Sequence, residues 1–172
     1  MSSPQREVVE STVIPAPPEA VWDVIDDTSR YADWVTTVDE VTRHHGRATV
    51  GETYSERNTV LGPLKATSTW TVVQADAPRR RLDRGVGMPV VQDLESIFEL
   101  DPVEGPGGAA HTEFRYIARY RMGLGPLGGL IDRIQAPGMR KEFRASMARL
   151  AELVRHEATP PPSDGADTPG RP

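Results

Sequence analysis

The sequence contains no cysteine, and this absence excludes several classes of protein. Disulfide frameworks, thiolate nucleophiles and cysteine-based zinc or iron–sulfur sites all need that side chain. Long hydrophobic runs are missing too: no stretch approaches the roughly 18 residues of a membrane span, and the polar first residues lack the apolar core of a signal peptide. We therefore expect a cytoplasmic protein without a membrane span.

Positive charge is also scarce, with 20 Lys+Arg against 25 Asp+Glu and a net charge of −5. Surfaces that follow nucleic-acid phosphates usually carry a basic excess, so we expect no nucleic-acid partner. The one basic cluster combines Arg79, Arg80 and Arg81 with Arg84. Because these side chains alternate between the two faces of a strand, they do not form one continuous phosphate-binding stripe. We predict a solvated strand edge there instead.

Both ends lack the residues that a folded core needs. Residues 158–172 contain no large apolar side chain, and their Pro, Gly, Asp and Ser cannot offset the entropy of ordering. We predict disorder over 158–172 and over 1–6. Residues 7–157 then form one domain with a single core.

Within this domain the pattern changes from one strand to two short helices, then to many strands and a last long helix. A β-branched run ending at Pro15 predicts a strand over 7–14, and helical spacing predicts short helices over 19–25 and 30–34. Gly and Pro then separate predicted strands at 38–44, 53–60, 64–74, 79–86, 92–100 and 112–122. A helix over 139–157 is predicted by an apolar stripe at helical spacing: Met139, Phe143, Met147, Leu150 and Val154.

A long amphipathic helix needs a sheet to cover. We therefore predict an α+β helix-grip fold, in which a bent antiparallel sheet wraps around the C-terminal helix.

Two motifs resemble a known family. The run STVIPAPPEAVWDVI at 11–25, followed by YADW at 31–34, resembles the opening of the START-like polyketide cyclase/dehydrase family, also called SRPBCC proteins. The run GPLGGLID at 125–132 is similar to the same family. The resemblance covers 7–157 and implies the helix-grip fold of birch-pollen-allergen-like proteins. It also implies a deep cavity between sheet and helix that holds an apolar or aromatic ligand, polyketide- or lipid-like. It carries over no catalytic residue.

Alternation along the strands predicts an inner face that is apolar with a few polar groups. Such a mixture suits a pocket where shape provides affinity and a few polar groups provide orientation. The alternative is that the aromatic side chains simply fill the core. The candidate ligand-binding residues are Tyr54, Asn58, Trp70, Phe98, Tyr116, Tyr120, Met122, Phe143 and Met147.

Catalysis would need a base and an acid that face one cavity, because cyclisation requires enolisation at one carbon and polarisation of a carbonyl. Glu56 is the candidate base if burial raises its pKa, with Tyr116 or Tyr120 as the acid. The alternative places Glu56 at a strand end, in a surface ion pair with an arginine.

No metal or cofactor is expected. If His44 and His45 continue a strand, their rings point to opposite faces and cannot share a metal. The run GLGPLG at 123–128 matches a dinucleotide-binding pattern, but it follows a strand of a meander rather than a βαβ unit. We interpret its glycines as a hinge that lets 127–135 cover the cavity. The alternative is a tight connection without gating.

Three functions remain open: a carrier of a small hydrophobic or aromatic molecule, a polyketide cyclase or dehydratase, and a module that binds a macromolecule. A wet cavity with paired Glu and Tyr favours catalysis, a dry cavity favours carriage, and a filled core with an exposed apolar patch favours a partner. We expect a monomer or homodimer.

Overall fold

The computed structural model describes residues 4–44, 46–61, 64–124 and 126–158. The predicted disorder of 1–3 and 159–172, and the prediction for His45, lie outside these residues. The predicted disorder is wrong for the described residues closest to the domain, at Arg6 and Ala158. Arg6 pairs with Tyr120 in the sheet, and Ala158 is the last residue of the final helix.

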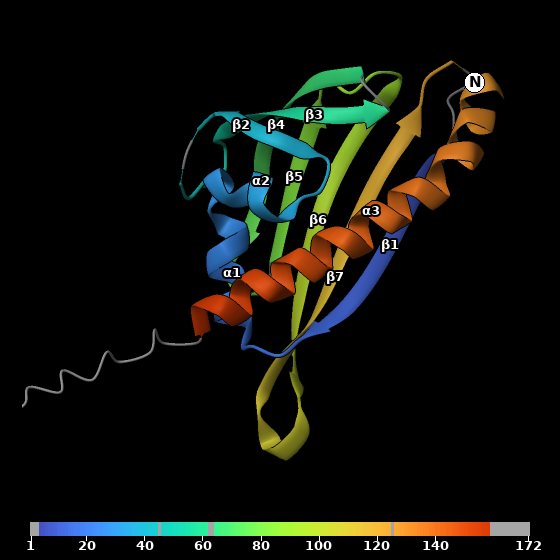
Figure 1. The fold of residues 1–172 in the computed structure, drawn as a ribbon. Helices are drawn as coiled ribbons and strands as arrows, with labels where there is room; N and C mark the ends of the chain where they lie inside the picture. Colours follow the sequence, from blue (N-terminus) through green and yellow to red (C-terminus); the bar gives the residue numbers. More distant parts are fainter. Residues whose placement is uncertain (1–3, 45, 62–63, 125, 159–172) are drawn as a thin grey trace, which may run out of the picture.

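Seven strands form one antiparallel sheet in the order β1-β7-β6-β5-β4-β3-β2 (Figure 1). Neighbours in sequence from β2 to β7 are also neighbours in space, because Gly- and Pro-containing turns join them directly. The strands are β1 (Gln5–Ile14), β2 (Val38–Arg43), β3 (Thr53–Leu61), β4 (Leu64–Asp76), β5 (Arg80–Val86), β6 (Val91–Glu104) and β7 (Ala110–Met122). The helical elements are α1 (Pro18–Asp26), the 3-10 turn η1 (Thr28–Arg30), α2 (Tyr31–Trp34), the 3-10 turn η2 (Pro106–Gly108) and α3 (Pro126–Ala158).

Helix α3 crosses the concave face of this sheet, with α1 and α2 near its C-terminal end (Figure 1). Met147, Leu150 and Val154 of the predicted stripe are buried in the main core, while Met139 and Phe143 pack against a second cluster of buried residues. The predicted α+β helix-grip fold is confirmed. Of the helices in the described part of the chain, none is long and apolar enough to cross a membrane.

The first turns of α3 differ from the prediction. The helix begins at Pro126 and continues through Pro137, whereas the sequence predicts a hinged segment over 127–135 and a helix from residue 139. Gly128 is tightly packed, since a Cβ at this position would collide with the carbonyl oxygen of Gly123. Gly128 is therefore required for a close approach of backbone. Movement of residues 127–135 over the cavity stays a prediction.

The main core is largely aromatic. Trp34 of α2 contacts the rings of Tyr31, Phe98 and Phe114 at centroid distances of 5.5, 5.6 and 6.5 Å. These edge-on contacts add to the stabilisation from apolar burial. Through these contacts α2 packs against the centre of the sheet.

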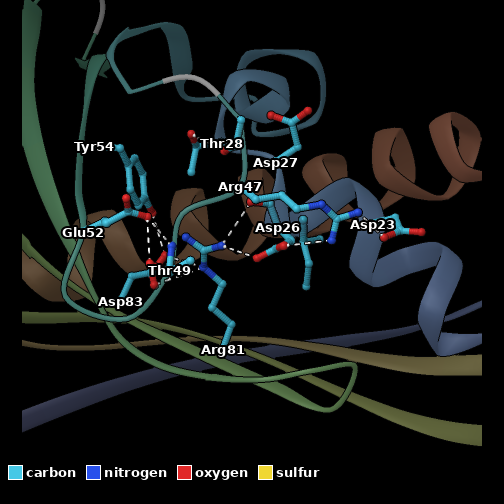
Figure 2. Close-up of polar contacts among 12 residues, drawn as sticks. Asp23, Asp26, Asp27, Thr28, Arg47, Thr49, Glu52, Tyr54, Arg81 and Asp83 are labelled. Atoms are coloured by element: carbon cyan, nitrogen blue, oxygen red, sulfur yellow. Dashed lines mark hydrogen bonds and ion pairs between the residues drawn. The ribbon is translucent and has the colours of Figure 1, made fainter.

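A buried ion network joins β5 to α1 (Figure 2). Arg81 is 0% exposed, and its Nε lies 3.0 Å from Asp83 Oδ2, while its Nη1 lies 3.3 Å from Asp26 Oδ1. Tyr54 donates its hydroxyl proton to Asp83 Oδ2 at 2.7 Å. Arg47 extends the network outward, with its Nη1 3.1 Å from Asp26 Oδ2.

The predicted solvated edge at residues 79–81 is therefore wrong for Arg81. Strand β5 is the fourth of seven in the sheet, so both of its edges are paired and its inner face is covered. Arg81 is opposite Phe98 in the register with β6, which directs its side chain into the main core. There the guanidinium lies 5.9 Å from the Tyr31 ring and 5.8 Å from the Tyr54 ring.

Replacing Arg81 with methionine should lower the free energy of unfolding by about 3–5 kcal/mol, because Asp83 would stay buried without its counter-ion. The matched control is Arg84→Met on the same strand, whose side chain is 65% exposed and paired with Glu95. This control should cost less than about 1 kcal/mol. Urea unfolding of both variants measures the difference, and similar losses would contradict a stabilising role for the network.

Candidate functional site

Glu56 lies in a polar cluster on the inner face of β3 and β4. It is opposite Ser68 in the register of the two strands and is only 4% exposed. Trp70 Nε1 donates to Glu56 Oε2 at 2.9 Å, and the Ser68 hydroxyl donates to the same oxygen at 3.4 Å. Asn58 Nδ2 donates to Ser68 Oγ at 2.7 Å. These contacts hold the carboxyl group in one position.

The Glu56 carboxyl group has an unusual electrostatic environment. Burial raises its pKa from 4.5 to about 7, against the opposing effect of the Trp70 hydrogen bond; the nearby Asp83 adds to the increase. Among the described residues no cation lies within ion-pair distance of Glu56. The alternative of a surface ion pair is therefore wrong, and the group is poised to accept or release a proton near neutral pH.

The two candidate acids occupy different environments. Tyr116 stacks on Phe143 of α3 with ring centroids 3.9 Å apart. Burial, and secondly the Glu56 charge, raise the pKa of Tyr116, so its phenol stays protonated. The Tyr120 hydroxyl instead donates to Asp132 Oδ1 at 2.6 Å. The structure therefore brings Tyr116 near Glu56 and pairs Tyr120 with a carboxylate of α3.

A small cavity of about 80 Å³ lies beneath the first turns of α3, beside Tyr120. Its polar lining consists of Tyr120, Asp132 and Gln135. The apolar part of the lining comes from β6, β7, α3 and the loop before β6: Met88, Val91, Leu94, Met122 and Met139. This is smaller than the roughly 300–1,000 Å³ of most ligand pockets. Methionine side chains are flexible, so these walls can be reshaped.

The predicted ligand-binding residues divide among four places. Tyr120 and Met122 line the cavity, and Asn58 and Trp70 belong to the polar cluster around Glu56. Phe143 stacks on Tyr116 where the main core meets the second cluster. The remaining three lie in the main core: Tyr54, Phe98 and Met147. Their roles in binding stay predictions.

Sequence reasoning missed Asp132 and the pair formed by Arg81 and Asp83. Asp132 lies seven residues, or two helical turns, before Met139, so extending the apolar stripe past Pro137 would have found it. Arg81 and Asp83 alternate with more exposed residues on β5, and this spacing places them on one face. Only the neighbouring strands show that this face is buried.

Metal ligands do not gather in the described ranges: no group of three or more His, Asp or Glu side chains could hold an ion there. His44 Nδ1 instead lies 3.0 Å from Thr28 Oγ1. The glycine pattern at 123–128 follows β7, which is antiparallel to both of its neighbours. This context differs from the parallel βαβ unit that binds dinucleotides.

Comparison with known proteins identifies relatives of this architecture. The family model described as polyketide cyclase / dehydrase and lipid transport matches residues 5–155. The structure of the Zhui aromatase/cyclase from Streptomyces sp. R1128 is similar, with a TM-score of 0.69 and 14% identity over 91% of this chain and 97% of that one. A Thermus thermophilus protein, TTHA0849, is similar with a TM-score of 0.68 and 21% identity over 90% of this chain and 100% of that one. At these identities the two structures share the fold. The search of curated proteins finds no match.

The raised pKa of Glu56 predicts a specific pH dependence of stability. The folded protein holds the Glu56 proton up to about pH 7, whereas the unfolded chain releases it near 4.5. Stability contributed by protonated Glu56 is therefore present at low pH and lost as pH rises through this window, by on the order of 3 kcal/mol.

Urea unfolding of the wild type and of Glu56→Gln between pH 5 and 8 measures this effect. The wild type should lose stability relative to the variant as pH rises, because the amide cannot ionise. A difference between the two proteins that does not change with pH would show that Glu56 titrates normally.

Proposed function

Because the chain belongs to the polyketide cyclase/dehydrase and lipid transport family, we propose that it binds a small hydrophobic or aromatic molecule, polyketide- or lipid-like, between the sheet and α3. The observation that carries this proposal is the methionine-rich cavity beneath the first turns of α3. Apolar walls supply affinity through burial, while Tyr120, Asp132 and Gln135 offer polar groups that orient a ligand.

The cavity also lies where the helix is easiest to displace. Between residues 127 and 138 of α3, only Gly128 and Asp132 are buried, whereas Met147, Leu150 and Val154 anchor the later turns in the main core. A ligand larger than the cavity can therefore enter by moving methionine side chains and the first turns of α3, at little cost to the main core.

Filling the cavity should weaken binding. N-phenyl-1-naphthylamine, a neutral fluorescent probe, should bind the wild type, and Met139→Trp should raise its Kd at least about tenfold by occupying the space. Ile134→Trp is the matched control, because this α3 residue is 72% exposed and should leave the Kd unchanged. Fluorescence titration measures both variants, and circular dichroism verifies that each is folded. Equal Kd values for the wild type and Met139→Trp would exclude this cavity as the site.

A second candidate function, proton transfer in a cyclase- or dehydratase-type reaction, is favoured by the burial of Glu56 among neutral donors. In this reaction the Glu56 carboxylate accepts the proton α to a ligand carbonyl, breaking the C–H bond and leaving an enolate. The Tyr116 phenol donates a hydrogen bond to the enolate oxygen. In a cyclisation the enolate carbon then bonds to a second carbonyl carbon of the ligand, whose C=O π bond breaks, and the alkoxide oxygen takes the proton from Glu56. Without that attack the proton returns to the α carbon, which is the exchange reaction.

Deuterium exchange tests this second function without knowledge of the natural substrate. The wild type in D₂O should accelerate exchange of the methyl protons of 2-acetonaphthone, with a rate that rises as pH increases through about 7. Glu56→Gln should lower the rate by about 100-fold or more, and Ile134→Trp should not change it. NMR measures the exchange, and a wild-type rate equal to that of buffer would rule out this activity on the probe.

A further inference from the structure

We infer that the cavity selects its ligand through Asp132, taking apolar molecules that carry a hydroxyl donor and disfavouring carboxylates. This inference rests on the proposed binding function and names the chemical class that this site would accept. It follows from the position of Asp132, from the acceptor sites its carboxylate still has, and from the charges around the cavity.

Asp132 occupies a position where a helix normally places an apolar side chain. It is 8% exposed, whereas Leu127, Leu130 and Ile134 on the same turns are 57%, 55% and 72% exposed. An amphipathic helix that packs on a sheet usually buries its leucines and exposes its carboxylates. These turns do the reverse, and so direct a carboxylate towards the cavity at the expense of apolar burial.

The carboxylate keeps unused acceptor sites. Tyr120 donates to Oδ1 at 2.6 Å, and Arg6 Nε lies 3.4 Å from Oδ2. A carboxylate has about four lone-pair directions, so these two contacts leave room for a third donor. Burial and the Asp132 contact raise the pKa of Tyr120, which keeps its proton and its bond to Asp132. At Asp132 the site therefore offers a ligand a hydrogen-bond acceptor, and the Tyr120 hydroxyl proton is already used.

The charges around the cavity favour a neutral donor over an anion. Among the described residues that line the cavity, Asp132 is the single charged one, and the other side chains are apolar, phenolic or amide. The two arginines whose charges act on Tyr120 each have a carboxylate partner, since Arg6 pairs with Asp132 and Arg140 pairs with Glu10 at 3.1 Å. A ligand carboxylate would therefore meet a like charge in an apolar surrounding. A hydroxyl would form a charge-assisted hydrogen bond.

Three matched probes test the inference: naphthalene, neutral 2-naphthol and 2-naphthoate, each measured by displacement of N-phenyl-1-naphthylamine at pH 7.5. The wild type should bind 2-naphthol at least about tenfold more tightly than 2-naphthoate, and more tightly than naphthalene. Asp132→Asn should reduce the preference for 2-naphthol over 2-naphthoate to within about threefold, because the like charge is removed. Glu152→Gln, an exposed carboxylate on α3, is the control and should leave the preference unchanged.

A second variant keeps the test decisive if Asp132→Asn does not fold. Tyr120→Phe removes one donor from Asp132 and keeps its charge, so the preference for 2-naphthol should be retained or increased. Equal affinity of the wild type for 2-naphthol and 2-naphthoate, an unchanged preference in Asp132→Asn, or a lost preference in Tyr120→Phe would each overturn the inference. In those cases binding of naphthalene would still support the proposed function. If the wild type binds none of the three probes and does not bind N-phenyl-1-naphthylamine, both the proposed binding function and the selection through Asp132 fail.

Discussion

A guanidinium buried in the middle of the sheet is the constraint on which the rest of this structure depends. Arg81 is held by Asp83 on its own strand and by Asp26 at the end of α1. Removing a carboxylate partner from a buried arginine is strongly destabilising, so the contacts with Asp26 and Asp83 fix where α1 ends relative to β5. It also positions Asp83, which accepts from Tyr54 and contributes to the raised pKa of Glu56.

The interior of the domain has two parts with different roles. Around Trp34, aromatic rings and the later turns of α3 form a close-packed core that contains most of the buried apolar residues. Around Tyr120 and Met122, the second cluster is smaller, contains the cavity and is covered by turns of α3 with few buried side chains. Because the main core is separate from the second cluster, the cavity can change shape while the main core keeps the fold.

The burial of Glu56 has opposite consequences for the stability of the fold and for proton transfer. A buried carboxyl group with only neutral donors lowers stability whenever it ionises. The same surroundings give it a pKa near 7, the range in which a side chain exchanges protons most effectively. Asp132 presents a related case, since a leucine at that position would bury more apolar surface but would accept no hydrogen bond.

The sequence by itself determined the order of the elements, the alternation that buries Tyr54, Glu56 and Asn58, and the apolar stripe of α3. These features depend on local periodicity, which neighbouring residues encode. Only the tertiary structure decided that Arg81 is buried, that Tyr116 rather than Tyr120 lies near Glu56, and that Asp132 faces a cavity. Alternation assigns a residue to a face, but whether that face is covered depends on the order of strands in the sheet. Pro137 similarly resembles a helix end in sequence, and contacts with the sheet decide that the helix continues through it.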